Sequence, residues 1–207
     1  MSLKYDPKEA VAELGRLDKK LARLIRKVGP CTLSPPKMQS PFQALARSII
    51  YQQLSGKAAG TIHSRVEALF PRRKGLKPQD ILDSPDDELR SAGVSRNKIA
   101  ALKDLSAKTF DGTVPTLAKL KQMEDEEIIE RLVQVRGIGQ WTVEMLLIFR
   151  LGRPDVLPVN DLGVRKGFSI TYKTRDLPAP SDLLEYGERW RPWRSVASWY
   201  LWRANEL

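Results

Sequence analysis

The chain has 207 residues, of which 42% are hydrophobic and 29% are charged, as in an ordinary soluble globular protein. Lys and Arg outnumber Asp and Glu by 35 to 25; the formal net charge of +10 fits either a polyanionic partner, most often nucleic acid, or a charge that serves solubility alone. A single cysteine, Cys31, excludes an internal disulfide, an iron–sulfur cluster and a cysteine zinc site, and a single histidine, His63, argues against a histidine metal centre or a Ser-His-Asp triad.

Nothing in the sequence predicts a membrane segment or a secretory signal. No apolar run approaches the roughly 18 residues of a membrane span, and the first six residues lack the apolar core of a signal peptide. We therefore expect an intracellular protein, cytoplasmic and at the nucleoid if the source is bacterial, and nuclear if it is eukaryotic.

Apolar residues at helical spacing run through most of the chain and predict an all-α architecture with short loops. A short strand fits only around 30–37, and a basic loop with Arg72, Arg73, Lys74 and Lys77 is expected at 71–78. In the first half of the chain we predict one long helix from Asp6-Pro7 to Gly29-Pro30, a helix capped by Ser40-Pro41, and a helix that runs from Ser55-Gly56 to before Pro71. Three shorter helices follow: one at 78–82, one that starts at Ser84-Pro85 with a capping signature and ends at Gly93, and one capped by Ser95. The remaining predicted helices are at 124–135, at 141–151, from Asp161 onward, and at about 192–204.

The turn between the helices predicted at 124–135 and 141–151 carries the sequence Gly137-Ile138-Gly139. Both glycines allow positive φ and leave room for a phosphate, and the N–H groups that begin the second helix form a ready anion site. Ile138 can plug the turn from inside. The same pattern occurs in plain helix–helix turns, and it lacks the third glycine and preceding strand of a dinucleotide-binding fingerprint. The hypothesis is a turn that makes non-specific contacts to a DNA strand.

A lone carboxylate, Asp161, follows Pro158-Val159-Asn160 and begins a helix, because Pro158 blocks helix formation before it. An N-cap is the ordinary role of an Asp in this position. The helix dipole also favours the ionised carboxylate, which could act on a nucleotide that the turn anchors.

Three motifs together resemble the helix-hairpin-helix DNA glycosylase superfamily, and within it the 3-methyladenine DNA glycosylase II branch of bacteria and yeast. They are VRGIGQWT at 135–142, LPVNDLGVRKG at 157–167 and WRPWRS at 190–195. The similarity covers about residues 40–204 and the catalytic core alone. It implies a two-lobed helical fold with a central cleft for DNA. In that fold residues 40–120 form the first lobe, 121–175 carry the hairpin and catalytic segment, and the N- and C-terminal helices form the second lobe.

By this resemblance Asp161 is the catalytic residue, a carboxylate that stabilises the positive charge developing on the sugar as the N-glycosidic bond breaks. The branch often has a second Asp where this chain has Asn160, which argues against a two-carboxylate acid/base scheme. Superfamily members that also cut the DNA backbone carry a Schiff-base lysine at the position of Trp141, so the resemblance implies a monofunctional enzyme.

The resemblance also places aromatic residues around an extruded base. Trp202 is implied to stack on the base. Its electron-rich indole would attract a cationic alkylated purine. Trp141 borders the pocket, although it could instead be a core anchor, and Met145 and Leu162 stand where relatives carry aromatic residues. Most of the three tryptophans Trp190, Trp193 and Trp199 are expected to be core residues, with Trp193 the first candidate.

Residues in two regions are implied to contact the DNA. In the loop 51–56, the expected minor-groove wedge is Gln53, with Leu54 as the second candidate, and Ser55 is also expected to contact the DNA. The alternative is a plain turn with Leu54 buried. In the hairpin, the expected contacts are Gly137, Ile138, Gly139, Gln140 and Thr142. Relatives hold a Na⁺ or K⁺ ion on the hairpin carbonyls, here those of Val133, Val135 and Ile138. The basic groups Arg96, Lys98, Arg165 and Lys166 either touch phosphates or are solvated.

The sequence therefore predicts a monomeric glycosylase that flips an alkylated base out of double-stranded DNA and hydrolyses the N-glycosidic bond without a required cofactor. Two alternatives stay open. One is a glycosylase for deaminated or oxidised bases, and the other is a non-catalytic protein that binds damaged DNA.

Overall fold

The computed structural model describes residues 3, 5–36, 38, 40–71 and 75–207. Every element of regular secondary structure in this part of the chain is a helix, which confirms the predicted all-α class. The short strand expected at 30–37 is wrong for 30–36, which has no regular structure, and residue 37 lies outside the described residues, as do Arg72, Arg73 and Lys74. Within the same ranges no helix has both the length and the apolar character needed to cross a bilayer.

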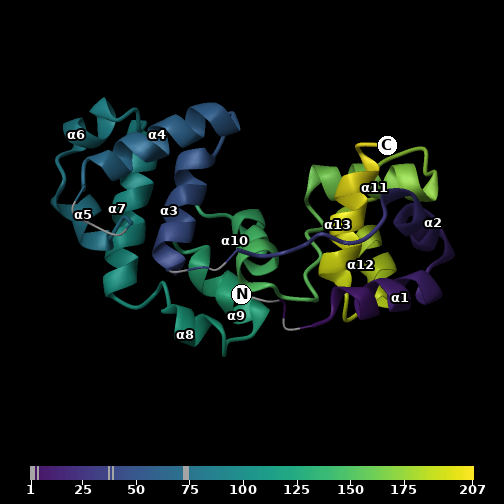
Figure 1. The fold of residues 1–207 in the computed structure, drawn as a ribbon. Helices are drawn as coiled ribbons and strands as arrows, with labels where there is room; N and C mark the ends of the chain where they lie inside the picture. Colours follow the sequence, from purple (N-terminus) through teal and green to yellow (C-terminus); the bar gives the residue numbers. More distant parts are fainter. Residues whose placement is uncertain (1–2, 4, 37, 39, 72–74) are drawn as a thin grey trace. The chain divides into compact units, whose positions relative to one another are not determined.

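The chain divides into two compact units (Figure 1). Unit 1 combines Met1–Lys37 with Leu147–Leu207, and unit 2 is Met38–Leu146. The segment 121–175, expected to carry both hairpin and catalytic residue, is divided between them: the hairpin belongs to unit 2 and Asp161 to unit 1.

Unit 1 joins the two ends of the chain. The N-terminal helices α1 and α2 lie beside the C-terminal helix α13, and α13 packs along α11 (Figure 1). The helices of unit 1 are α1 (Pro7–Leu17), α2 (Lys19–Val28), a π-helix η1 (Leu147–Leu151), α11 (Leu162–Tyr172), α12 (Pro180–Gly187), a 3₁₀ helix η2 (Glu188–Trp190) and α13 (Arg194–Ala204).

The single helix expected between Asp6 and Gly29 is wrong, because two helices meet at Asp18. Asp18 has extended backbone angles, and its Oδ1 accepts hydrogen bonds from the N–H groups of Lys20 and Leu21, both at 3.0 Å. An aspartate competes for backbone N–H groups in this way and favours a cap over a helix interior. The apolar spacing continues through the break, so periodicity alone does not reveal it.

Asp18 is also the polar centre of unit 1. Its other oxygen, Oδ2, accepts hydrogen bonds from the Tyr172 hydroxyl (2.5 Å), Trp190 Nε1 (3.1 Å) and the Tyr186 hydroxyl (3.2 Å). Burial raises the pKa of Asp18, but the hydrogen bonds outweigh this and hold the pKa below its usual value. One carboxylate thus connects α2, α11, α12 and η2.

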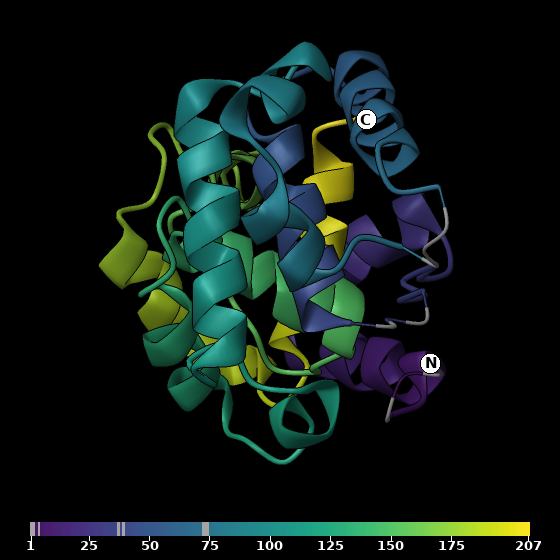
Figure 2. The same cartoon turned by 90° about the vertical axis from the view of Figure 1, so that its left-hand side faces the viewer.

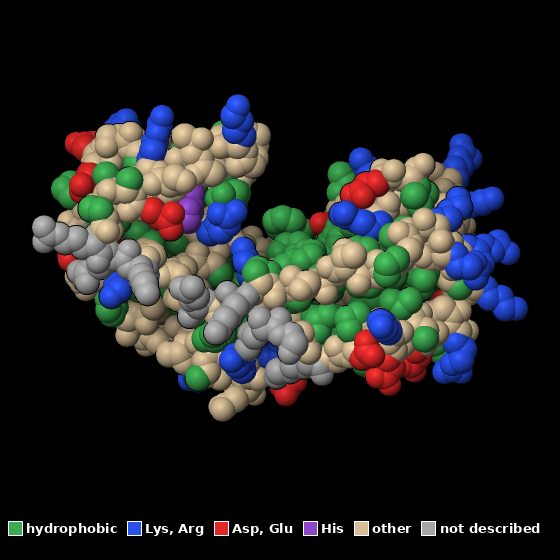
Figure 3. Space-filling model, viewed as in Figure 1, with side chains coloured by type: hydrophobic (Ala, Val, Ile, Leu, Met, Phe, Trp, Pro, Cys, Tyr) green, Lys and Arg blue, Asp and Glu red, His purple; other side chains and the backbone are tan. Residues whose placement is uncertain are grey.

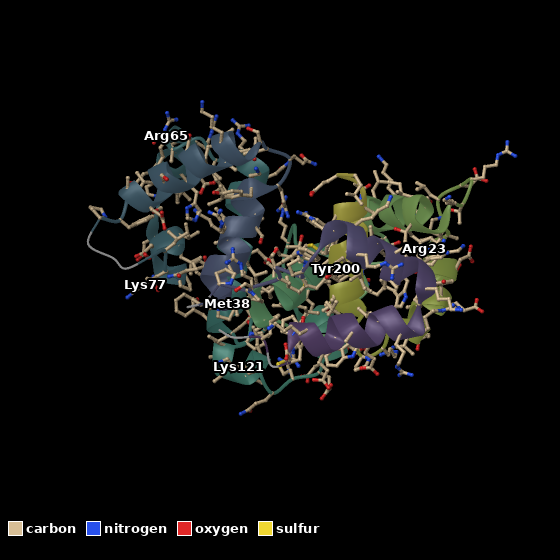
Figure 4. All side chains as sticks on the ribbon, turned by 45° about the vertical axis from the view of Figure 1, so that its right-hand side comes forward. Arg23, Met38, Arg65, Lys77, Lys121 and Tyr200 are labelled. Carbon is tan, nitrogen blue, oxygen red and sulfur yellow. The ribbon has the colours of Figure 1, made fainter. Side chains whose placement is uncertain are left out.

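The core tryptophan of the WRPWRS motif is Trp190 rather than Trp193. Trp190 is fully buried, whereas Trp193 is partly exposed at the start of α13 and donates a hydrogen bond to Glu13 Oε2 at 2.6 Å. The expectation that Trp193 is the first core residue is therefore wrong. Tyr200, labelled in Figure 4, is fully buried on α13, and its hydroxyl donates to the carbonyl of Gly29 at 2.9 Å.

Unit 2 is organised on its longest helix, α7, against which α3, α5 and α6 pack (Figure 2). The close packing leaves Leu102 and Leu105 of α7 fully buried. The helices of unit 2 are α3 (Pro41–Tyr51), α4 (Gly56–Ala68), α5 (Pro78–Asp83), α6 (Asp86–Ser91), α7 (Arg96–Phe110), α8 (Leu117–Leu120), α9 (Asp125–Leu132) and α10 (Gln140–Leu146).

Several predicted boundaries differ from the structure. Ser84 does not cap α6, because its hydroxyl donates back to the carbonyl of Asp80 in α5 at 2.8 Å and Pro85 takes the N-cap position. Helix α9 ends at Leu132 instead of 135, and α13 begins at Arg194 instead of 192. Helices α8, α12 and η2 have no counterpart among the predictions, since they are short and lack a long apolar repeat.

Part of the positive charge gathers on the exposed face of α2 (Figure 3). The sequence of this helix, KKLARLIRKV, contains no acidic residue. Its apolar residues Leu21 and Leu24 are buried, while Arg23 is exposed (Figure 4). The helix is therefore anchored by its apolar side and presents its cations to solvent.

Candidate functional site

Asp161 is the N-cap of α11, as the sequence predicts. Its Oδ1 accepts two hydrogen bonds, from the N–H of Val164 at 2.7 Å and from Trp202 Nε1 at 2.8 Å. Two donors on one oxygen fix the orientation of the carboxylate, and the positive end of the helix dipole stabilises its charge. The side chain is partly exposed, so the carboxylate is held rigidly and still accessible.

The indole of Trp202 connects the carboxylate to an aromatic surface. Trp202 lies in the last turn of α13, and its ring centroid is 5.5 Å from that of Phe149, with 35° between the planes. Phe149 lies in the π-helix η1, and the sequence analysis missed it. The predicted partners Asp161 and Trp202 are thus brought together, and Phe149 joins them.

Small residues let α11 approach α13 closely enough for this contact. A Cβ atom on Gly163 would be 2.8 Å from Trp202 Cδ1 and 3.1 Å from Asp161 Oδ1, and one on Gly167 would collide with the backbone of Leu201. The side-chain amide of Asn205 donates to the carbonyl of Gly163 at 2.9 Å. Two glycines in the first turns of a helix predict such an approach, so Gly163 could have been found from the sequence.

The WRPWRS motif anchors the segment that leads to α11. The N–H of Val156 donates to Ser195 Oγ, and the N–H of Ser195 donates to the carbonyl of Pro154, both at 2.9 Å. The buried Arg194 guanidinium binds Asp155 through Nε (2.7 Å) and Nη2 (3.1 Å). Helix α13 therefore holds this segment at its first turn and the carboxylate itself at its last turn.

The hairpin of unit 2 presents backbone rather than side chains. Gly137 has φ +78°, in the left-handed region that only glycine adopts without strain, and Ile138 and Val135 are buried beneath the turn. A Cβ on Gly139 would meet no atom within 4 Å, so the backbone there borders open space. The carbonyl of Gly139 accepts the N–H of Thr142 at 2.9 Å as α10 begins.

The loop between α3 and α4 exposes the predicted wedge residues. Gln53 has φ +56°, unusual for a residue other than glycine, and Leu54 is 41% exposed. The alternative of a turn with Leu54 buried is therefore wrong. Ser55 is exposed, and its hydroxyl accepts a hydrogen bond from the N–H of Ala58 at 3.3 Å as the cap of α4.

The Lys98 side chain binds backbone carbonyls at the start of this loop. Its ammonium donates to the carbonyls of Ile50 and Gln52, both at 2.8 Å, and burial lowers its pKa. The side-chain amide of Gln52 in turn donates to the carbonyl of Gly137 at 2.8 Å. The expectation that Lys98 is simply solvated is wrong, and a phosphate contact by its ammonium stays a prediction. Gln52, which was not predicted, joins the exposed loop to the hairpin.

Comparison with known proteins identifies this arrangement. The family model for HhH-GPD superfamily base excision DNA repair proteins matches residues 46–192. The chain belongs to this superfamily. DNA-3-methyladenine glycosylase 1 of Schizosaccharomyces pombe is 36% identical over 200 residues, 96% of this chain and 88% of that protein.

Two solved structures of glycosylases agree with the HhH-GPD assignment. The S. pombe 3-methyladenine DNA glycosylase in complex with abasic DNA has a TM-score of 0.83 at 36% identity and covers 96% of this chain and 97% of its own. The DNA-3-methyladenine glycosidase of Bacillus halodurans has a TM-score of 0.84 at 35% identity, and the match covers 99% of this chain and 91% of that protein's chain. The family predicted from the three motifs is confirmed.

Within this HhH-GPD chain, unit 2 has a pocket of about 440 Å³ at the end of α3 and the start of α10. It brings Gln53 next to three residues predicted for the site, Trp141, Thr142 and Met145, and its lining is completed by Ser48, Tyr51 and Gln52. Trp141 is 50% exposed, so it borders the pocket rather than anchoring a core. Thr142 is buried, in contrast to its exposed neighbour Gln140.

The four residues predicted for the base pocket come from both units. Trp141 and Met145 belong to unit 2, and Trp202 and Leu162 to unit 1. Leu162 is 52% exposed at the first position of α11. That these four residues line one pocket stays a prediction.

The hairpin carbonyls offer the oxygen donors that a monovalent cation takes. The carbonyl of Val135 accepts the N–H of Ile138 at 3.0 Å, which leaves its second lone pair for another partner. The carbonyls of Val133, Val135 and Ile138 are thus chemically suited to Na⁺ or K⁺, and the cation stays a prediction. Among the described residues, no three His, Cys, Asp or Glu side chains group as metal ligands do.

Of the two basic groups predicted on α11, one has a structural partner. Arg165 Nε donates to the carbonyl of Pro178 at 2.9 Å and so fixes the loop that follows the helix, while Lys166 is exposed.

Proposed function

We propose that this chain is a monofunctional DNA glycosylase that removes alkylated bases from double-stranded DNA and leaves an abasic site for base excision repair. The bases are of the 3-methyladenine and 7-methylguanine type. The relatives named 3-methyladenine glycosylases and the S. pombe complex with abasic DNA support this function.

One observation carries the proposal: the Asp161 carboxylate is fixed by Val164 N–H and by the indole of Trp202. Breaking an N-glycosidic bond develops positive charge on the sugar. A carboxylate already oriented by two donors stabilises that charge without reorganising, so it lowers the barrier more than it tightens ground-state binding.

The damaged base must leave the helix before it can react, which makes stacking on an aromatic face valuable. The part-exposed Trp202 indole, backed by Phe149, offers such a face beside the carboxylate. An electron-rich indole attracts a cationic alkylated purine more than a neutral one. The same ring thereby selects the lesion and orients the group that acts on its sugar.

In the reaction the C1′–N bond breaks, and its electron pair leaves with the base. A cationic alkylated purine departs as a neutral molecule and needs no general acid, in keeping with a site that has Asn160 beside Asp161. Water then forms the new C1′–O bond and loses a proton, which Asp161 accepts in this proposal as it orients the attacking molecule. The products are the free base and an abasic sugar.

Trp141 determines that the DNA strand stays intact. An indole cannot form the Schiff base that a lysine forms at this position in strand-cutting superfamily members. We propose that the chain acts as a monomer, without a required cofactor, in the compartment that holds the chromosome.

The test is single-turnover base release from duplexes that each carry one defined lesion: 3-methyladenine, 7-methylguanine, a deaminated base or an oxidised base. We expect release of the alkylated bases, strand breaks only after hot alkali, and no covalent adduct when borohydride is added. Asp161→Asn serves as the catalytic control.

Each alternative has its own result. Release confined to deaminated or oxidised bases would replace the substrate class, and lesion binding without any release would indicate a non-catalytic damage binder. A strong borohydride-trapped band would mean that another lysine, for example Lys166, forms a Schiff base, and the monofunctional assignment would fail.

A further inference from the structure

Helix α7 presents two charged side chains, one turn apart, to the loop of the hairpin. Asp104 Oδ2 accepts a hydrogen bond from the backbone N–H of Arg136 at 2.7 Å. The Lys108 ammonium donates to the carbonyl of Gln134 at 2.5 Å and to Asp104 Oδ2 at 2.8 Å. One acidic and one basic group therefore hold an N–H and a carbonyl two residues apart on the same loop.

The two side chains are shielded enough for these bonds to matter. The side chains of Asp104 and Lys108 are only 31% and 25% exposed. Burial raises the pKa of Asp104, but the Arg136 N–H and the Lys108 ammonium outweigh it and hold the pKa below its usual value. The carboxylate therefore stays charged at neutral pH, and hydrogen bonds to charged groups are stronger than neutral ones.

The same helix supports the turn by direct packing. A Cβ on Gly137 would lie 3.3 Å from Ala101 Cβ, which shows how closely the turn sits on α7. Ala101, Asp104 and Lys108 follow one another at helical spacing and so share one face of α7. This face meets the hairpin loop at 134–137, which ends two residues before Gly139, where the backbone borders open space.

We propose that Asp104 and Lys108 are positioning residues for the DNA-binding hairpin: they fix the backbone at 134–136, and with it the direction in which the N–H groups of the turn face a phosphate. This inference rests on the proposed function. Neither residue needs to contact DNA for this role.

The opposite charges of Asp104 and Lys108 also matter for the electrostatics of the phosphate-binding turn. An uncompensated carboxylate beside a phosphate-binding turn repels the phosphate, and the Lys108 ammonium neutralises it. Lys108→Met should thus weaken DNA binding more than Asp104→Ala, because it removes one bond to the loop and leaves the negative charge behind. Removing both groups relieves the repulsion. The rise in Kd of the double variant should therefore be smaller than the product of the rises measured for the two single variants.

The experiment measures Kd for an undamaged duplex and for a duplex with an abasic site, and base release at saturating enzyme. We expect Kd to rise about 5-fold for Asp104→Ala and about 10-fold or more for Lys108→Met on both duplexes, with release at saturation within 2-fold of wild type. Asp104→Asn keeps an acceptor for Arg136 and should restore Kd to within about 2-fold of wild type.

Lys103→Met is the matched control. Lys103 lies on the same helix and forms an ion pair with Asp86 at 2.5 Å, away from the hairpin, so its loss should leave Kd unchanged. Melting curves identify the temperature at which each variant is folded, and Kd is measured below it. If Asp104→Ala does not fold, Lys108→Met and Asp104→Asn carry the test.

Kd values equal to wild type in folded Asp104→Ala and Lys108→Met would overturn the inference while the proposed function stands. An increase in Kd that Lys103→Met shares would assign the effect to the stability of α7 and overturn it too. A wild-type chain that neither binds a duplex nor releases a base would overturn the proposed function, and this inference with it.

Discussion

The two units of this chain prepare their functional groups in opposite ways. Unit 1 offers a side chain, Asp161, whose oxygen is held by a neighbouring indole and a backbone N–H. Unit 2 offers a stretch of backbone at Gly139, where no side chain stands in the way. A carboxylate that stabilises a transition state needs fixed direction, whereas a turn that binds any phosphate needs access.

Their glycines show the same contrast. Gly163 in unit 1 makes room for the protein's own indole, because a Cβ would be 2.8 Å from Trp202 Cδ1. Gly139 in unit 2 faces open space, which leaves room for a ligand. Changes in unit 1 should therefore impair the chemical step at constant binding, and changes in the hairpin should impair binding at constant chemistry.

Asp161→Asn should give the largest effect. The Asn side chain can still accept the two N–H bonds, so the geometry survives while the charge is lost. We expect single-turnover base release to fall about 1,000-fold and Kd for lesion DNA to stay within a few-fold. Release near the wild-type rate would remove Asp161 from the mechanism and make it a plain helix cap.

Asp18→Ala should separate the structural carboxylate of unit 1, Asp18, from Asp161, the carboxylate proposed to act in catalysis. It removes the cap of α2 and leaves three aromatic donors without their acceptor, which should lower the free energy of unfolding by about 3 kcal/mol. Denaturant unfolding measures this, and Kd for DNA at a temperature where the protein is folded should not change. A loss below about 0.5 kcal/mol would show that the network is dispensable.

The same residue predicts an acid limit. The pKa of Asp18 in the folded protein lies below that of an unfolded Asp, about 3.9, so its stabilising effect is complete above that pH and is lost as pH falls through the folded pKa. Asp18→Asn, which can still cap α2, should flatten the stability profile below pH of about 4. An unchanged slope there would assign the acid limit to other groups.

The sequence predicted what local chemistry specifies. Pro158 before Asp161 defines a helix start, and two glycines around Ile138 define a turn, so both were placed correctly. The family followed from three motifs that are individually common and jointly specific. The break at Asp18 was missed because the apolar spacing continues through it, and because the three aromatic donors to the second carboxylate oxygen lie more than 150 residues away.

The supporting residues were equally hidden. Nothing near Lys98 in the sequence shows that its ammonium caps the end of α3, and nothing near Phe149 shows that it meets Trp202. Both contacts depend on how helices pack, which periodicity constrains only to a face. The sequence therefore indicates which residues are candidates for the chemistry, but it does not indicate most of the residues that hold those candidates in place.

Gly163→Ala tests whether the indole contact matters for catalysis. The new methyl group must displace Trp202 or the carboxylate, and we expect base release to fall about 10- to 100-fold with Kd for undamaged DNA unchanged. Gly15→Ala is the control, since its Cβ would meet only Ala22 at 4.0 Å and should add helix stability without affecting release. Full activity in Gly163→Ala would mean that the Trp202–Asp161 bond is incidental.

Gly139→Val should give the smallest effect and the one most specific to binding. The added side chain has space in the protein, so the melting temperature should hold, but it covers backbone that a phosphate would approach. We expect Kd to rise about 10-fold for damaged and undamaged duplexes alike, because a phosphate contact carries no sequence information, while release at saturating enzyme stays near wild type. Gly137→Ala is the contrasting control: with φ +78° and Ala101 nearby, it should lower the melting temperature. Weakened binding of damaged DNA alone in Gly139→Val would place the hairpin in lesion recognition and break the division between the two units.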